Sequence, residues 1–126
     1  MKKKILIADD DPDLVEILQD RLGLAGYETA TAFEGIRVIE LANKWSPDLI
    51  LLDLKMPAGT GQLTLKSLRK RSETKTIPVI VLTALQGGTL EKEVRDEGAD
   101  DFLQKPFDVN VLLQRIATLL QKGRTD

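Results

Sequence analysis

The stretch Leu49-Ile50-Leu51-Leu52-Asp53 (residues 49–53) places four consecutive apolar residues directly before an acid. An unbroken apolar run of this length predicts a strand that is covered on both faces, as in a parallel sheet with helices on each side. The pair Ser46-Pro47 breaks the chain before this run, and residues 57–61 predict a loop after it. The stretch is therefore predicted to be a central strand that carries Asp53 at its carboxyl end.

A short apolar run followed by an amphipathic segment recurs along the chain on both sides of this strand. The predicted strands are residues 5–8, 27–32, 49–52, 77–82 and 102–103. The predicted helices run from the cap Asp11-Pro12 to the stop at Gly26, over residues 34–44, through Leu63, Leu65 and Leu68, from the cap Thr89 through Leu90 and Val94, and from the cap Asp108 onward. Strands that alternate with helices predict an α/β fold, in which a five-stranded parallel sheet carries helices on both faces.

The length of 126 residues suits one domain. We expect that domain to occupy residues 1–122, and residues 123–126 are interpreted as a C-terminal tail or the stub of a linker. The sequence after Asp108 has room for one helix. We therefore expect this chain to carry no DNA-binding or catalytic output module.

Composition excludes several classes of function. The chain has 18 basic and 20 acidic residues and a net charge of -2, so no excess of charge predicts direct binding of nucleic acid or of a membrane surface. No apolar run approaches the roughly 20 residues that span a bilayer, and the run after Lys2-Lys3-Lys4 is too short for a signal peptide. We expect a cytoplasmic protein. Histidine and cysteine are both absent, which excludes the usual zinc sites, thiol nucleophiles and Ser-His-Asp triads.

The residues that could take part in catalysis or metal binding follow the carboxyl ends of the predicted strands. These are Asp9-Asp10-Asp11, Asp53, Thr83-Ala84 and Gln104-Lys105-Pro106. Asp11 before Pro12 is interpreted as a helix cap, but capping does not account for Asp53, which follows a buried run. Clustered carboxylates raise each other's pKa, so such a cluster favours a bound cation, and oxygen ligands suit Mg²⁺.

Four segments resemble those of bacterial response-regulator receiver domains, and the resemblance extends from about Lys4 to Leu120. The segments are residues 5–12 (ILIADDDP), 48–57 (DLILLDLKMP), 78–84 (PVIVLTA) and 98–107 (GADDFLQKPF). The family has a doubly wound, flavodoxin-like fold with strand order 2-1-3-4-5, and the resemblance implies that order here. The chain has Thr60-Gly61 where many members have Asp-Gly, which keeps the glycine of the turn.

The resemblance implies a role for each acid at this edge. Asp53 corresponds to the phosphoacceptor. Asp10 and Asp53, with the backbone carbonyl of Lys55, would bind Mg²⁺ directly, and Asp9 would orient a metal-bound water. Lys105 would pair with Asp53 and then with an oxygen of the phosphoryl group. In-line phosphoryl transfer requires mainly positioning and neutralisation of charge, which this set of groups provides.

The resemblance also implies a conformational switch. The Thr83 hydroxyl would donate to the phosphoryl group, and the small Ala84 would leave space beside it. Phe102 would rotate inward as Thr83 moves. The peptide bond before Pro106 would be cis.

The expected partners follow from the same resemblance. Because the chain has no histidine, the phosphoryl donor is expected to be a separate histidine kinase or histidine phosphotransfer protein or domain. A downstream output protein or domain would recognise the face made by the helix after Gly87-Gly88, the last strand and the last helix. A phosphorylation-dependent homodimer would use that face too.

Three other functions stay open at this point. A small phosphatase with an aspartate nucleophile would be an enzyme with turnover, but it usually carries a second aspartate where this chain has Lys55. A receiver-like interaction module that is not phosphorylated would normally lack one of the residues Asp10, Asp53, Thr83 and Lys105. A flavodoxin-like cofactor domain would have a phosphate-binding loop where this chain has acids after the first strand. We expect a phosphoacceptor that catalyses only its own phosphorylation and dephosphorylation, rather than an enzyme with turnover.

Overall fold

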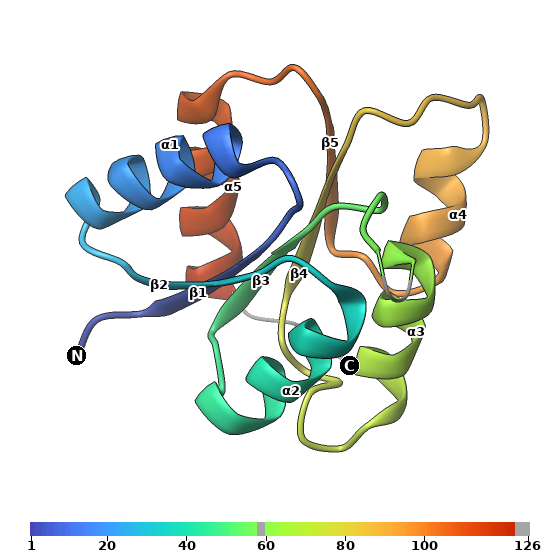
Figure 1. The fold of residues 1–126 in the computed structure, drawn as a ribbon, viewed down its shortest axis with the longest axis horizontal. Helices are drawn as coiled ribbons and strands as arrows, with labels where there is room; N and C mark the ends of the chain where they lie inside the picture. The colour runs from blue at the N-terminus through green and yellow to red at the C-terminus, as the bar shows by residue number, and fades with distance from the viewer. Residues whose placement is uncertain (58–59, 123–126) are drawn as a thin grey trace.

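The computed structural model describes residues 1–57 and 60–122 and contains one five-stranded parallel sheet (Figure 1). The strands are β1 (Lys4–Ala8), β2 (Glu28–Ala32), β3 (Leu49–Leu52), β4 (Val79–Thr83) and β5 (Asp101–Gln104). The helices are α1 (Pro12–Leu24), α2 (Gly35–Trp45), α3 (Gly61–Lys70), α4 (Leu90–Asp96) and α5 (Val109–Lys122). The strand order is β2-β1-β3-β4-β5, so the predicted doubly wound fold and its order are confirmed.

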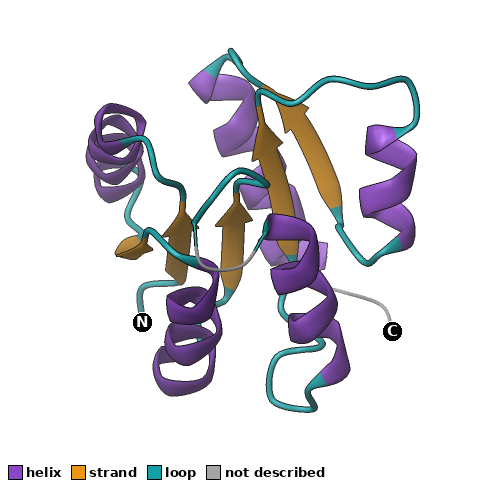
Figure 2. Ribbon diagram, turned by 45° about the vertical axis from the view of Figure 1, so that its right-hand side comes forward, coloured by secondary structure: helices purple, strands orange, loops and turns teal. Residues whose placement is uncertain are grey.

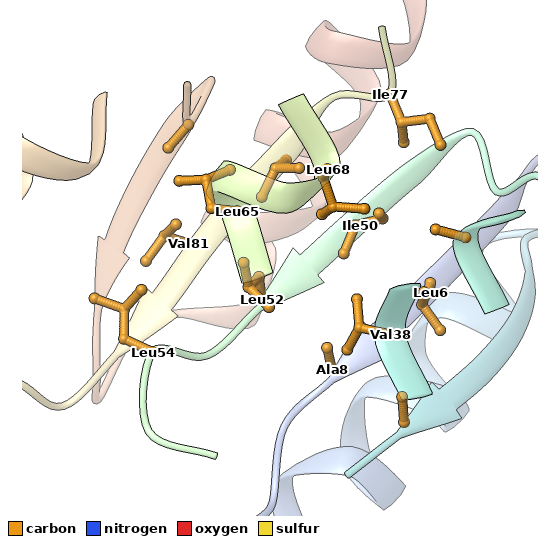
Figure 3. Close-up of a cluster of buried hydrophobic side chains, with 14 of the residues drawn as sticks. Leu6, Ala8, Val38, Ile50, Leu52, Leu54, Leu65, Leu68, Ile77 and Val81 are labelled. Atoms are coloured by element: carbon orange, nitrogen blue, oxygen red, sulfur yellow. The ribbon is translucent and has the colours of Figure 1, made fainter. Parts of the chain in front are cut away.

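Helices cover both faces of the sheet, as Figure 2 shows. Helices α1 and α5 pack on one face, where Leu18 and Leu112 are fully buried among the side chains of alternate strand residues. Helices α2, α3 and α4 cover the other face. There Val38 and Leu65 pack with Ile50 and Leu52 of β3 (Figure 3). Residues of β3 thus point into both cores, which explains why its sequence is apolar without alternation.

Local sequence signals explain most of the helix ends. The Asp11 carboxylate accepts hydrogen bonds from the backbone N–H groups of Asp13 and Leu14, which confirms it as the cap of α1. The Asp108 carboxylate accepts from Asn110 N at the start of α5. The expectation for Thr89 was wrong in detail. It occupies the cap position of α4, but within the described residues its hydroxyl makes no capping bond and donates instead to Glu93 Oε1 at 2.8 Å.

Some predicted boundaries and apolar contacts differ from the structure. Strand β4 begins at Val79 rather than 77, because Ile77 N is used in a turn to Thr74 O and Pro78 has no N–H to give. Three apolar residues at helical spacing, Ile17, Ile36 and Leu63, stay 50%, 64% and 59% exposed. The predicted tail, residues 123–126, lies outside the described residues, as do residues 58 and 59 of the predicted loop. Among the helices of the described chain, none is long and apolar enough to cross a membrane.

Candidate phosphoacceptor site

Backbone hydrogen bonds of the sheet position two aspartates just past their strands. Asp9 follows β1, and its N–H donates to Ala32 O at 3.2 Å. Asp53 follows β3, and its N–H donates to Ala8 O at 2.8 Å. The parallel pairing therefore continues one residue beyond each strand. Both carboxylates are held at the same edge by the backbone rather than by flexible loops.

Three carboxylates meet at this edge. One oxygen from each of Asp9, Asp10 and Asp53 lies within 4.8 Å of the other two. Asp9 and Asp53 are buried, whereas Asp10 is exposed. Oxygen atoms at this spacing are the donor set that a hard divalent cation prefers, and Asp10 gives such an ion access from solvent. The structure thus brings together the three acids that were predicted to take part in a metal site, and these acids could hold a metal ion.

Lys105 reaches the same cluster from the segment that follows β5. Its Nζ donates to Asp9 Oδ2 at 2.7 Å and to Asp53 Oδ2 at 3.3 Å. The Lys105 N–H donates to Thr83 O at 2.8 Å, and the Lys105–Pro106 peptide bond is cis. The resemblance implied a pairing of this lysine with Asp53. In the structure the lysine contacts both carboxylates, and Asp9 is the closer one.

Burial and neighbouring charges shift the pKa values of Asp9 and Lys105. Burial raises the pKa of Asp9, and the nearby charge of Asp53 adds to that effect, while hydrogen bonds from Lys105 and the Asp11 backbone oppose it. Burial opposes the charge of Lys105, but its bonds with Asp9 and its attraction to both carboxylates raise its pKa overall. Lys105 is therefore a cation at neutral pH. A further positive charge beside Asp9 would oppose the effect of burial on its pKa.

Thr83 and Ala84 lie at the end of β4, beside the acids. Thr83 is fully buried, and its Oγ1 accepts a hydrogen bond of 3.2 Å from Leu85 N. Ala84 is exposed and lines an open groove of about 500 Å³ together with Lys105 and Phe107. The threonine hydroxyl thus holds the backbone of the β4–α4 loop in this structure.

Phe102 and Lys55 have more specific surroundings than the sequence indicated. Phe102 is partly buried against the apolar cluster under α3 and α4. The Lys55 N–H donates to Asp53 Oδ1 at 3.2 Å, whereas Lys105 donates to the other carboxylate oxygen, Oδ2. A second hollow of about 470 Å³ opens beside Asp10 and Lys55. Of the three acids, Asp10 is the one that lines this hollow.

Gly61 has a role that the sequence analysis did not assign. A Cβ at this position would lie 2.5 Å from Asp53 O and would also meet Leu54 Cα. The Gly61 N–H donates to Leu54 O at 3.0 Å. The glycine is therefore required by close approach of α3 to the backbone that carries Asp53. The sequence marked Gly61 only as part of a turn.

Asp101 is a second position that sequence reasoning missed. It lies on β5 and accepts hydrogen bonds from Arg115 of α5, at 2.7 Å and 2.8 Å, and from Arg95 of α4 at 3.1 Å. Burial pushes its pKa up, but these arginines and the Phe102 N–H lower it overall. Asp101 therefore joins the two helices that flank β5. The predicted strand began at Phe102, one residue after Asp101, so the sequence gave no signal that this acid belongs to the sheet.

Comparison with known proteins was informative along almost the whole chain. A family model described as the response regulator receiver domain matches residues 5–117. The DNA-binding dual master transcriptional regulator RpaA of Synechocystis is 43% identical over 98% of this chain and 50% of its own length. The transcriptional regulatory protein CpxR of Escherichia coli is 41% identical over 95% of this chain and 50% of its own length. This chain thus spans about half the length of these curated relatives.

A solved structure gives the same result for the fold. The receiver domain of the Francisella response regulator 1452 superposes with a TM-score of 0.90 and 34% identity, covering 96% of this chain and 98% of that chain. The similarity to this receiver domain therefore extends over nearly the full length of both chains.

Proposed function

The chain belongs to the family of response regulator receiver domains of two-component systems, and from that premise we propose that Asp53 accepts the phosphoryl group. One observation carries the assignment. Asp53 is 4% exposed, shares its edge with Asp9 and Asp10, and lies 3.3 Å from the ammonium of Lys105. A carboxylate nucleophile forms an acyl phosphate, which is a reactive linkage suited to a transient signal.

We propose Mg²⁺ as the metal. Asp10 and Asp53, with the Lys55 carbonyl, would bind it, and Asp9 would orient its water. The all-oxygen donor set and the raised pKa of Asp9 support a hard cation at this edge. When bound, Mg²⁺ would neutralise charge on the phosphoryl oxygens and align them with the attacking carboxylate.

The protein's own groups would do the rest. Lys105 would exchange its bond with Asp53 for one with a phosphoryl oxygen, because the acyl linkage removes the charge on the Asp53 carboxylate. The Thr83 hydroxyl would donate to another phosphoryl oxygen, beside the space that Ala84 leaves. In this structure Thr83 Oγ1 accepts from Leu85 N. Rotation of the Thr83 side chain toward the phosphoryl group would break this bond and free the β4–α4 loop. We propose that the domain catalyses only this transfer and its reversal by hydrolysis.

The phosphoryl donor would be a histidine kinase or a histidine phosphotransfer protein, since this sequence has no histidine. The groove lined by Leu14, Ile17, Lys105, Phe107 and Val109 supports a docking place for the donor. Its lining is mostly apolar and includes the lysine beside Asp53. A donor seated in it would present its histidine to the acids. A cytoplasmic location stays part of this proposal.

The output would be regulation of transcription, because the curated relatives are named as transcriptional regulators. The relatives are about twice as long, so the output element would be a second domain or a separate protein. We propose that it reads the face made by α4, β5 and α5. Phe102 and Asp101 of this face lie on the strand that follows Thr83 in the sheet, which supports coupling between the two. A phosphorylation-dependent homodimer would use the same face.

Intact-protein mass spectrometry tests the proposal. The protein is incubated with Mg²⁺ and a small acyl phosphate, and we expect the mass to increase by one phosphoryl group. The Asp53→Asn variant should not be labelled. Asp20→Asn is the matched control, because Asp20 is an exposed aspartate on α1, and it should be labelled like the parent. Equal labelling of Asp53→Asn and the parent would refute the assignment.

A further inference from the structure

One face of α3 holds the C-terminal end of α4. The residues are Gln62, Lys66 and Arg69, which are four and three positions apart and so share one helix face. Gln62 Nε2 donates to Glu97 Oε1 at 3.2 Å, and Lys66 Nζ lies 3.2 Å from Glu97 Oε2. Two side chains of α3 therefore bind Glu97, the C-cap residue directly after α4.

Arg69 fixes the turn that follows. Its guanidinium donates to Gly98 O at 2.9 Å and to Asp100 Oδ2 at 3.0 Å, and to Ile77 O before β4 at 2.8 Å. The Asp100 carboxylate also accepts from Val79 N at 2.8 Å. Arg69 is 11% exposed, so these charge-assisted bonds are shielded from water. Gly98 has a φ of +114°, and a Cβ there would lie 2.7 Å from Arg69 Cγ, so backbone and arginine fit closely.

The N-terminal end of α4 is held differently. All residues from Ala84 to Thr89 are exposed, and no described atom lies within 4 Å of a Cβ built on Gly88. The loop is connected to the strands at Leu85, whose N–H donates to Thr83 Oγ1 and whose carbonyl accepts from Gln104 Nε2 at 3.4 Å. The first of these bonds is the one that the proposed switch would break. Val94 is the buried residue of α4, and it lies in the half nearer Glu97.

We propose that α4 switches by pivoting about its C-terminal end, with residues 97–100 held in place by the polar face of α3. This inference rests on the proposed function, because it takes the release of Leu85 N by Thr83 as its cause. When that bond opens, the exposed loop and the first turn of α4 move, while Glu97, Gly98 and Asp100 keep their bonds. Figure 1 shows α3 alongside α4, which allows α3 to act as the support.

The pivot divides the output face into a fixed part and a moving part. Arg95 lies in the second half of α4 and binds Asp101 at 3.1 Å, and Asp101 binds Arg115 of α5. These residues would have the same positions in both states. Leu85 and Glu91 lie on the moving side. A partner that distinguishes the phosphorylated form would therefore contact the β4–α4 loop and the first turn of α4. The ion pairs of Asp101 with Arg95 and Arg115 would be the same in both states.

Amide hydrogen exchange with and without beryllofluoride and Mg²⁺ tests the pivot, with peptides that separate residues 85–91 from 97–100. In the parent, we expect protection of residues 85–91 to change by about tenfold or more, which corresponds to about 1.4 kcal/mol of opening free energy. Residues 97–100 should not change. In Arg69→Gln, the change should extend to residues 97–100. The matched control is Arg71→Gln, an exposed arginine at the end of α3, which should behave like the parent.

Each outcome has one meaning. Equal changes at both ends of α4 in the parent would overturn the pivot and leave the proposed switch intact. No change anywhere between residues 83 and 107 would overturn the switch itself. An Arg69→Gln variant whose pattern matches the parent would show that α3 is not the support. If Arg69→Gln does not fold, Lys66→Gln removes one of the two bonds to Glu97 and should show the same extension in weaker form.

Discussion

Lys105 Nζ donates to Asp9 Oδ2 at 2.7 Å and lies farther, at 3.3 Å, from Asp53. The lysine thus stabilises a buried carboxylate other than the proposed phosphoacceptor. Asp9 is 1% exposed, so removal of its partner would leave a charge in a poorly solvated place. The lysine has a structural function in the unphosphorylated protein besides the catalytic one proposed for it.

Lys105→Met should lower the free energy of unfolding by about 1–3 kcal/mol without metal, because Asp9 loses its cation. Combining it with Asp9→Asn should recover most of that loss, because the amide is neutral and leaves no unpaired buried charge. Urea unfolding at neutral pH measures both. Additive losses in the double variant would show that the two residues do not stabilise each other.

Asp10→Asn should leave the stability of the metal-free protein within about 0.5 kcal/mol of the parent, because Asp10 is exposed. The parent should melt at a higher temperature when Mg²⁺ is added, and the variant should lose this increase. Thermal unfolding with and without Mg²⁺ provides the comparison. An equal increase in both proteins would place the metal elsewhere.

Gly61→Ala should destabilise the protein by about 1–3 kcal/mol, since a Cβ would collide with the backbone at Leu54 and with Asp53 O. Gly23→Ala is the matched control. Gly23 lies in α1 with no described atom within 4 Å of an added Cβ, so alanine should stabilise the helix by about 0.5–1 kcal/mol. In urea unfolding, we expect the free energy of unfolding to fall for Gly61→Ala and to rise for Gly23→Ala. Destabilisation of similar size at both sites would argue against the close approach.

Asp101→Asn should lower stability at neutral pH by about 1–3 kcal/mol, because bonds to Arg95 and Arg115 weaken. The folded-state pKa of Asp101 lies below its ordinary value of 3.8. Its contribution is therefore fully present above pH 3.8 and is lost as the pH falls through the lower, folded-state pKa. When the free energy of unfolding is measured as a function of pH, the values for parent and variant should converge in that acidic range.

Asp96→Asn is the control for this pH effect. Asp96 pairs with Lys92 on the exposed surface of α4, where solvent screening leaves such a pair with little effect on stability, so the variant should stay close to the parent at every pH. A variant of Asp101 that stayed equally destabilised at the most acidic pH would show that its effect is steric rather than ionic.

The strands could be predicted because their signals are local. The bounds of β3 follow from an apolar run that Ser46-Pro47 precedes, and parallel order then places Asp53 and Asp9 at one edge. The strand order itself came from resemblance rather than from periodicity. The start of β4 was predicted too early, because the use of Ile77 N in a turn with Thr74 has no signal in the sequence.

The polar contacts could not be predicted because they depend on how far apart two elements pack. Arg69 and Arg71 look alike in the sequence, yet Arg69 is 11% exposed and spans to Gly98, whereas Arg71 is exposed. The same holds for Gly61. A side chain is excluded at this position because α3 lies against the backbone of Asp53 and Leu54. The sequence predicted that acids and Lys105 meet at this edge, as they do in the structure, but it did not predict the side chains that position the elements around them.

Chemical trapping of the phosphorylated residue tests the central claim most directly. Borohydride reduces an acyl phosphate to an alcohol, so a phosphorylated aspartate becomes homoserine, and peptide mass spectrometry locates it. After incubation with Mg²⁺ and a small acyl phosphate, we predict homoserine at position 53, and none when Mg²⁺ is omitted. Homoserine at Asp9 or Asp10, or phosphate that survives at a serine or threonine, would contradict the account.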